Sequence, residues 1–200
     1  MNERSVSFRQ AAWKRLKKNK GAMAGLVLVL FSIIVALFSY VIAPDPSPFA
    51  NRIILEIGGS RPGFSQKFLL VKKPQPRTTN FLSGIFSGKP DAYEFVPITS
   101  HTQKSDSIVV EKYIDEGLTE RLSFHKNSVA KEPVISNTFL LGTDKYGRDI
   151  LSRLIVGTRV SLSVGLITVL ISLTIGIVLG AAAGYYRGQV DNIIMWLINV

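Results

Sequence analysis

Two long stretches of the sequence contain no charged residue, and they constrain the fold more than any other feature. The first runs from Gly21 to Pro44 and the second from Val160 to Tyr186. A helix that crosses a membrane needs about 20 apolar residues, because each residue advances about 1.5 Å through a hydrocarbon core of about 30 Å. A helix of this length in a soluble protein would carry polar residues along one face. The sequence therefore predicts an α-helical polytopic membrane protein.

The composition of the first stretch favours its insertion into a membrane. It holds 13 Leu, Ile, Val or Phe residues between Leu26 and Ile42. At about −0.3 to −0.6 kcal/mol each, they contribute roughly −4 to −8 kcal/mol. The alternative is a cleaved signal peptide, whose apolar part has only about 7 to 15 residues and ends in small residues at the cleavage site. Here VIAPDPSP (41–48) places prolines there instead. We therefore expect a retained transmembrane helix.

The net charge of +10 is concentrated at the N-terminus. Residues 1–20 contain seven Lys or Arg residues and one Glu, a charge of +6, directly before the first apolar stretch. Basic residues in that place hold the segment in the cytoplasm and contact anionic lipid headgroups. A nucleic-acid-binding arm has the same composition, but the neighbouring span favours membrane lipid, and we expect no nucleic-acid partner. The chain has no cysteine, so we expect no disulfide framework and no thiolate metal site.

These features divide the chain into seven segments. They are a basic cytoplasmic N-terminus (1–20), a first transmembrane helix (21–43), an extracytoplasmic insert (45–141), an interfacial amphipathic segment (142–158), a second transmembrane helix (160–184), a cytoplasmic loop (185–192) and the start of a third transmembrane helix (193–200). The last apolar run has eight residues, too few to span a membrane. We therefore expect the chain to be a fragment of a longer protein.

The insert is predicted to be a small β or α+β domain. It carries 12 basic and 10 acidic residues, so its charges nearly balance. Short β-prone stretches alternate with turns rich in Gly and Pro, and Pro74–Phe86 is expected to be a loop. The predicted strands are Arg52–Ile57, Lys67–Lys72, Tyr93–Ile98, Ser107–Ile114 and Glu120–Phe124.

Three glycines at four-residue intervals distinguish the second apolar stretch. Gly176, Gly180 and Gly184 fall on one helix face in the run GIVLGAAAG. Without side chains at these positions, another helix can approach closely, and packing replaces the hydrophobic force that is absent between helices in lipid. We expect this face to pack within a helix bundle. The alternative is a flexible or kinked helix end.

The segment LGTDKYGRDILSRLIVGTRVSL (141–162) is the most informative part of the chain. Two glycine-containing turns are expected before Asp149, a suitable N-cap for a short helix through Val156. An apolar stripe on that helix predicts that it lies at the membrane surface and leads into the second span. A plain surface helix of the insert is the alternative. The candidate site residues here are Gly142, Thr143, Asp144, Gly147, Arg148, Asp149 and Arg153.

Two longer runs carry a resemblance to a known family. LGTDKYGRDILSRLIVGTRVSLSVG, followed by GAAAGYYRGQVDNIIMWLINV, is similar to the opening of the transmembrane domain in permeases of dipeptide/oligopeptide ABC importers. The chain looks like the C-type subunit, whose basic start and proline-rich helix exit correspond to residues up to VIAPDP (41–46). The match covers about residues 10–46 and 140–200, and the permease domain would start at about residue 155. The insert departs from the short external loop of most members.

The resemblance implies a bacterial inner-membrane subunit with six helices that forms half of a translocation pathway. Its implied partners are a second permease subunit, two cytoplasmic ATPases and an extracytoplasmic peptide-binding protein, which the insert could contact. No GxxxxGK[ST] loop occurs in the sequence, so ATP binding is expected in the partner subunits and no cofactor in this chain. Substrate-binding residues and the family's coupling loop to the ATPases cannot be assigned to this sequence.

The sequence shows no catalytic constellation, and we expect no enzyme. His101 and His125 are isolated in the polar insert, and no nucleophile is paired with a base. The main alternative function is a membrane-anchored extracytoplasmic sensor or receptor domain, formed by the insert. That alternative explains the long insert, but it does not explain the glycine face or the resemblance.

The charge bias predicts the orientation of the chain. Because the sequence lacks cysteine, single cysteines at Ser5, Ser105 and Gln189 can report it. An impermeant thiol reagent applied to intact cells should label only position 105. Labelling at position 5 or 189 would reverse the expected orientation.

Overall fold

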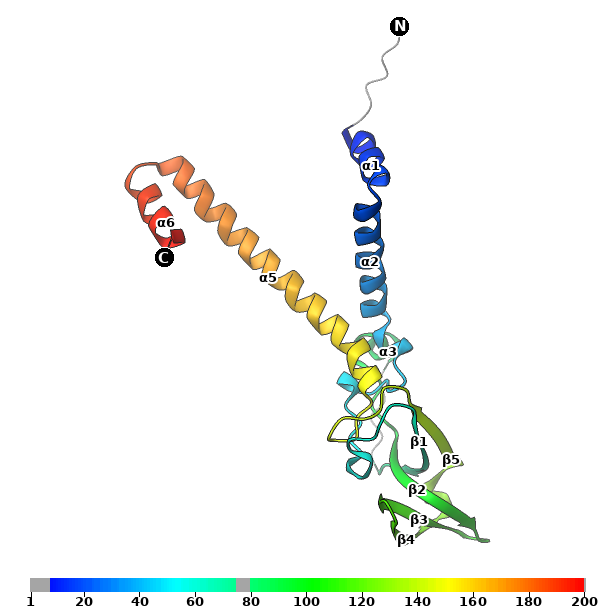
Figure 1. Ribbon diagram of the computed structural model, residues 1–200. Helices are drawn as coiled ribbons and strands as arrows, with labels where there is room; N and C mark the ends of the chain where they lie inside the picture. The colour runs from blue at the N-terminus through cyan, green and yellow to red at the C-terminus, as the bar shows by residue number, and fades with distance from the viewer. Residues whose placement is uncertain (1–7, 75–79, 200) are drawn as a thin grey trace. The chain divides into compact units, whose positions relative to one another are not determined.

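A computed structural model describes residues 8–74 and 80–199 of the chain. The chain divides into two compact units, the first ending at Arg159 and the second beginning at Val160. The first unit contains the N-terminal helices, the β-sheet and the first turns of a long helix, and the second contains the rest of that helix and the last one (Figure 1).

The first unit begins with three helices: α1 (Phe8–Lys18), α2 (Lys20–Leu37) and α3 (Ser39–Ile42). Asn19 caps α2, since its side chain accepts a hydrogen bond from the Ala22 N–H at 3.2 Å. Of the residues in α2 only Ala36 is buried, although the helix is apolar on every side. Such a helix is suited to contact with lipid. It is one of two described helices that are long and apolar enough to cross a membrane.

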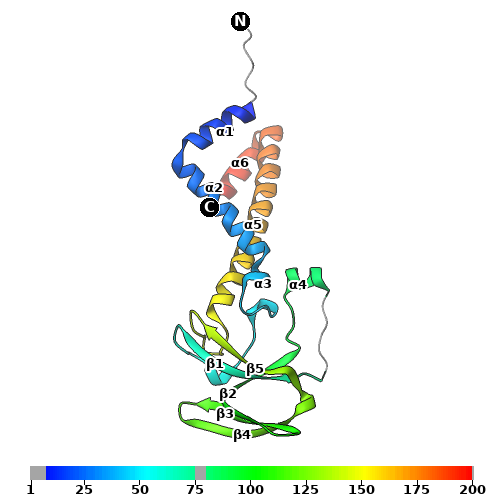
Figure 2. The same ribbon diagram turned by 90° about the vertical axis from the view of Figure 1, so that its right-hand side faces the viewer.

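The insert is built on one antiparallel sheet of five strands. The strands are β1 (Phe64–Lys72), β2 (Tyr93–Gln103), β3 (Ser107–Asp115), β4 (Leu118–His125) and β5 (Val129–Phe139). Their order is β4-β3-β2-β1-β5, so β2, β3 and β4 follow one another on one side of β1, and β5 pairs with its other side (Figures 1 and 2). The insert is therefore a folded β-rich domain, as the sequence predicted.

Two apolar clusters stabilise the sheet. The first joins β1, β2, β3 and β5 through Leu69, Val96, Ile98, Ile108, Val110 and Val129. In the second, the ring of Phe68 makes edge contacts with Phe95 and Phe139, at centroid distances of 6.0 and 6.3 Å. Ile54 and Ile57 belong to this second cluster. The segment between α3 and β1 is thereby packed against the sheet.

The structure confirms four of the five predicted strands and corrects the other. Residues 52–57 do not form a strand, because Ile54 and Ile57 turn to the same cluster and Leu55–Ile57 form a 3₁₀ turn, η2. The run of apolar residues there favoured a strand, but a strand would send residues three apart to opposite faces. Residues 129–139 form β5, which the sequence prediction missed because Lys131, Glu132 and Pro133 interrupt its alternation.

The expected loop at 74–86 contains a short helix. Helix α4 (Phe81–Ser87) lies beside α3, away from the sheet (Figure 2). Asn80 precedes it and Gly88 ends it, with the Gly88 N–H bonded to the Gly84 carbonyl. The prediction of a loop is therefore wrong for residues 81–86, and residues 75–79 lie outside the described part of the chain.

Helix α5 (Ile150–Tyr186) is continuous over 37 residues. The sequence suggested a short helix followed by a separate span, but no proline or cap interrupts the two. At about 1.5 Å per residue the helix is about 55 Å long, whereas a bilayer core measures about 30 Å. Thr168 and Thr174 donate their hydroxyl hydrogens to the carbonyls of Val164 and Leu170, so these polar groups are satisfied within the helix.

The second unit joins the rest of α5 to α6 (Gln189–Asn199). Arg187 and Gly188, both with positive φ, make the turn between them. Apart from the neighbouring backbone of α5 itself, no described atom lies within 4 Å of the position that a Cβ would take at Gly176, Gly180 or Gly184. Among the described residues, the glycine face of α5 is therefore open.

Candidate functional site

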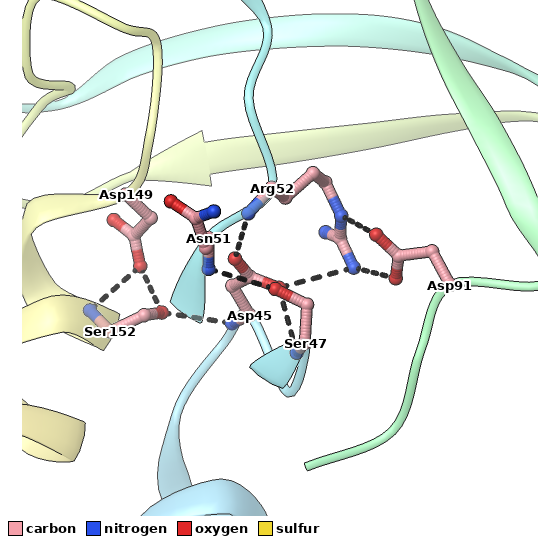
Figure 3. A network of polar contacts seen from close by, with 7 residues as sticks. All are labelled: Asp45, Ser47, Asn51, Arg52, Asp91, Asp149 and Ser152. Atoms are coloured by element: carbon pink, nitrogen blue, oxygen red, sulfur yellow. Dashed lines mark hydrogen bonds and ion pairs between the residues drawn. The ribbon is translucent and has the colours of Figure 1, made fainter. Parts of the chain in front are cut away.

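A polar junction connects α3, the sheet and the start of α5. It lies at the end of the insert from which these helices leave, which we call the foot of the insert. It consists of Asp45, Ser47, Asn51, Arg52, Asp91, Asp149 and Ser152 (Figure 3). All of these residues lie in the first unit. We call this group the polar junction.

Asp45 is the centre of the polar junction and is only 3% exposed. It follows the end of α3, and its carboxylate folds back on the next turn. Its oxygens accept the N–H of Ser47 at 3.0 Å and of Arg52 at 3.2 Å. Its own N–H donates to the Ser152 hydroxyl at 2.8 Å. The exit of the first apolar helix is thereby bound to the beginning of α5, 107 residues further along.

Arg52 connects Asp45 to the sheet. Its Nε and Nη2 donate to the two carboxylate oxygens of Asp91, just before β2, at 2.7 and 2.5 Å. The same Nη2 lies 3.3 Å from Asp45, and the guanidinium lies 3.8 Å above the Phe95 ring centre. Burial by itself lowers the pKa of Arg52, but the Asp91 hydrogen bond and the charges of Asp45, Asp91 and Asp149 raise the pKa above its usual value. Arg52 is a permanent cation between carboxylates.

Asp149 caps α5, as the sequence predicted. Its Oδ2 accepts the Ser152 N–H at 3.0 Å and also the Ser152 hydroxyl hydrogen. Both residues are buried, with exposures of 6% and 0%. The Ser152 hydroxyl thus donates to Asp149 and accepts from Asp45, which uses both its donor and an acceptor position. The helix start is therefore fixed to the rest of the polar junction.

The turn before α5 is organised by Asp144. Its Oδ1 accepts the N–H groups of Tyr146 and Arg148, and its Oδ2 accepts Arg148 Nε at 2.8 Å. Burial by itself raises the pKa of Asp144, but the Arg148 side chain and these backbone N–H groups outweigh it and lower the pKa. Arg148 Nη1 also donates to Asn51 at 2.9 Å. The Asp144 turn is in this way joined to the polar junction.

The residues before this turn fasten it to the loop ahead of β1. The Thr143 hydroxyl donates to the Ile57 carbonyl at 2.5 Å and accepts the Ser60 N–H at 3.0 Å. Gly142 and Gly147 have φ of +74° and +72°, and a Cβ on either would overlap the carbonyl oxygen of Ser60 or Ile54. Only glycine fits these two positions without displacing the neighbouring backbone.

The structure brings six of the seven candidate residues of this segment together, from Gly142 to Asp149. Arg153 is exposed at the edge of this group, and its Nε makes only a long ion pair with Asp144, at 3.9 Å. The structure adds Asp45, Arg52, Asp91 and Ser152 to the residues predicted from the sequence. An aspartate enclosed by prolines in PDP (44–46) was an available signal for the first of them. The other three contacts are between residues far apart in sequence, which no local pattern reveals.

An open groove of about 450 Å³ adjoins Arg52 on the sheet side. Four of its charged lining residues form two ion pairs, Arg52 with Asp91 and Lys112 with Glu56, and the Nζ–Oε1 distance of the second pair is 2.7 Å. Burial opposes both charges, yet the Glu56–Lys112 hydrogen bond keeps the pKa of Glu56 lowered and, as the largest influence on Lys112, raises that pKa. These groups are arranged to hold the fold together rather than to carry out acid–base chemistry.

The described residues contain no group of three or more His, Asp or Glu placed to hold a metal ion. His101 is exposed, and His125 lies 3.0 Å from Asp106 with its side chain 56% exposed. Both histidines are therefore surface residues of the sheet.

Replacement of Arg52 tests the polar junction. Arg52→Ala leaves Asp45 buried without its cation, and removal of one partner of a buried pair costs about 3 to 5 kcal/mol. We expect the insert to unfold at a clearly lower temperature, measured by circular dichroism of the purified protein. Arg61→Ala, at an exposed arginine nearby, should change stability by about 0.5 kcal/mol or less. If both variants unfold at the same temperature, Arg52 does not stabilise the insert.

Comparison with known proteins identifies similar chains. Residues 7–54 match the family model of the N-terminal transmembrane domain of oligopeptide transport permease C. The dipeptide transport system permease protein DppC of Bacillus subtilis is 29% identical over 196 residues, which is 98% of this chain and 38% of that protein. DppC of Lactococcus lactis is 26% identical over 196 residues, 98% of this chain and 46% of that protein. No solved structure matches the chain.

A shorter alignment shows higher identity. DppC of Haemophilus influenzae is 55% identical over 62 residues, which is 31% of this chain and 21% of that protein. The two longer alignments cover 98% of this chain and therefore run through the insert, while the chain spans less than half the length of either relative. Two long apolar helices and the transmembrane family model together indicate a membrane-embedded protein. The resemblance to the C-type permease subunits of peptide ABC transporters is confirmed.

Proposed function

We propose that the chain is part of a permease subunit of an ATP-driven importer of di- or oligopeptides and forms part of its translocation pathway. The observation that carries the proposal is the alignment of 98% of the chain with proteins named dipeptide transport permeases. The apolar surfaces of α2 and α5 support it, because both helices are suited to a membrane. The relatives are named as transport permeases, which supports a role in transport rather than in catalysis.

The subunit would act with partners. We propose a second permease, two cytoplasmic ATPases that bind the ATP, and an extracytoplasmic peptide-binding protein, in the inner membrane of a bacterium with the N-terminus in the cytoplasm. The polar junction would attach the insert firmly to the outer ends of both apolar helices. In that position the insert could receive the loaded binding protein.

Peptide uptake and co-purification test the proposal. Deletion of the gene should abolish growth of an amino-acid auxotroph on a dipeptide that contains the required amino acid, while growth on the free amino acid continues. The tagged subunit, solubilised gently, should bring a second permease and two ATPase chains with it. Normal dipeptide growth in the deletion strain, or purification with a kinase or cyclase instead, would contradict the proposed function.

The open glycine face of α5 is the proposed contact with a neighbouring helix of the complex. Gly180→Leu places a large side chain on that face and should reduce the yield of the assembled complex in detergent. Val178→Leu is the matched control, since Val178 is 60% exposed and the change adds little volume. Complex yield is measured by gel filtration of the tagged protein. If both variants assemble equally well, the glycines do not form the contact.

A further inference from the structure

Helix α4 is held at the foot of the insert beside the first apolar helix. It packs against α3, and the backbone N–H of Lys89, just after α4, donates to the Pro46 carbonyl at 2.8 Å. In Figure 2 the helix stands away from the sheet, at the level of α3. The insert thus places a short apolar helix next to the end of α2 and α3 rather than in its own core.

Arg159 of α5 also contacts α4. Its guanidinium carbon lies 5.7 Å from the ring centre of Tyr40 and 5.4 Å from that of Phe86, distances typical of cation–π contacts. Its Nη1 donates to the Ile85 carbonyl at 3.4 Å. Tyr40 itself is buried, and its hydroxyl accepts the Phe49 N–H at 3.3 Å. One arginine therefore joins α3, α4 and α5.

This contact lies where the charged part of the chain ends. Arg159 is the last charged residue before the uncharged run 160–186, and Tyr40 stands near the end of the uncharged run 21–44. The change from charged to uncharged sequence marks the boundary of the hydrocarbon core. Because Phe86 touches the same guanidinium, α4 lies at that boundary.

The exposed groups at this boundary suit a lipid surface. The Phe86 side chain is 55% exposed, and Phe38, Val41 and Ile42 around α3 are 48%, 65% and 50% exposed. Among the described residues, Arg159 has no carboxylate within ion-pair distance. A guanidinium has five N–H donors, and only one of them is used on the Ile85 carbonyl. The remaining donors match the oxygens of a phosphate group.

We propose that α4 lies on the phospholipid surface, with Phe86 at the level of the headgroups and Arg159 bound to a lipid phosphate. Aromatic residues and arginines favour this zone, because each combines an apolar body with a group that tolerates or seeks polar surroundings. The partner is the bilayer itself. The proposal requires only that α2 and α5 cross a membrane, so it does not depend on peptide transport.

Depth-dependent fluorescence quenching tests the position of α4. A bimane label on Ser87→Cys, in a full-length variant from which any other cysteine has been removed, is measured in nanodiscs whose phospholipids carry a nitroxide near the headgroup. The same label on Ser105→Cys, in the turn between β2 and β3 of the sheet, is the control. We expect quenching at position 87 to be severalfold greater than at position 105. Equal quenching at the two positions would overturn the proposal.

Two further arms separate the lipid contact from other causes. Arg159→Ala should reduce the quenching at position 87, whereas Arg153→Ala, an exposed arginine on the same helix, should leave it unchanged. A benzophenone at position 87 of the assembled complex should form adducts with the mass of a phospholipid. Adducts with a partner subunit would show that protein covers α4 and would reject the lipid surface.

Discussion

The foot of the insert depends on one partly buried cation, Arg52, held between Asp45 and Asp91. Charges taken out of water lose their hydration, and their mutual attraction compensates only when the geometry is good and the remaining donors and acceptors are used. Here the requirement is met by two short hydrogen bonds to Asp91, a third contact to Asp45 and an aromatic ring beneath the guanidinium. The arrangement selects one position of the insert on its helices, because any displacement would leave buried charges unpaired.

The contacts of the polar junction also require particular backbone turns, a particular helix start and glycine at particular positions. Asp45 can accept from Arg52 only if the chain turns sharply after α3, and the prolines around it restrict the backbone there. Ser152 can bridge Asp45 and Asp149 only if α5 starts at Ile150. The loop from Gly142 to Gly147 fits against the Ile54 to Ser60 segment only without side chains at two positions. Each local choice is consistent with the same tertiary arrangement.

The sequence predicts those parts of the arrangement that depend on local patterns of residues. The apolar helices follow from uncharged runs longer than a bilayer requires, and β1 to β4 follow from β-prone segments between clear turns. The Asp149 cap follows from a polar residue before an apolar periodic run. The sequence does not predict β5, because its alternation is poor and the strand is stabilised by pairing with β1. The sequence predicts a strand where η2 forms, because the packing of Ile54 and Ile57 on the more distant Phe68 is not visible in the local pattern. Arg52, Asp91 and Ser152 gain their roles only from contacts that the fold creates.

The unbroken course of α5 has a mechanical consequence. A helix whose hydrogen-bond ladder is uninterrupted is a stiff rod, and bends in helices occur mainly at prolines, bulges or inserted groups. Helix α5 contains no proline, and its first turn holds Asp149 and Ser152 in place through the cap. A rotation of the helix about its axis would turn Ser152 with it and would strain the bond to Asp45. A twist of the helix would therefore put tension on the buried hydrogen bond between Ser152 and Asp45, together with the other contacts that hold the start of α5.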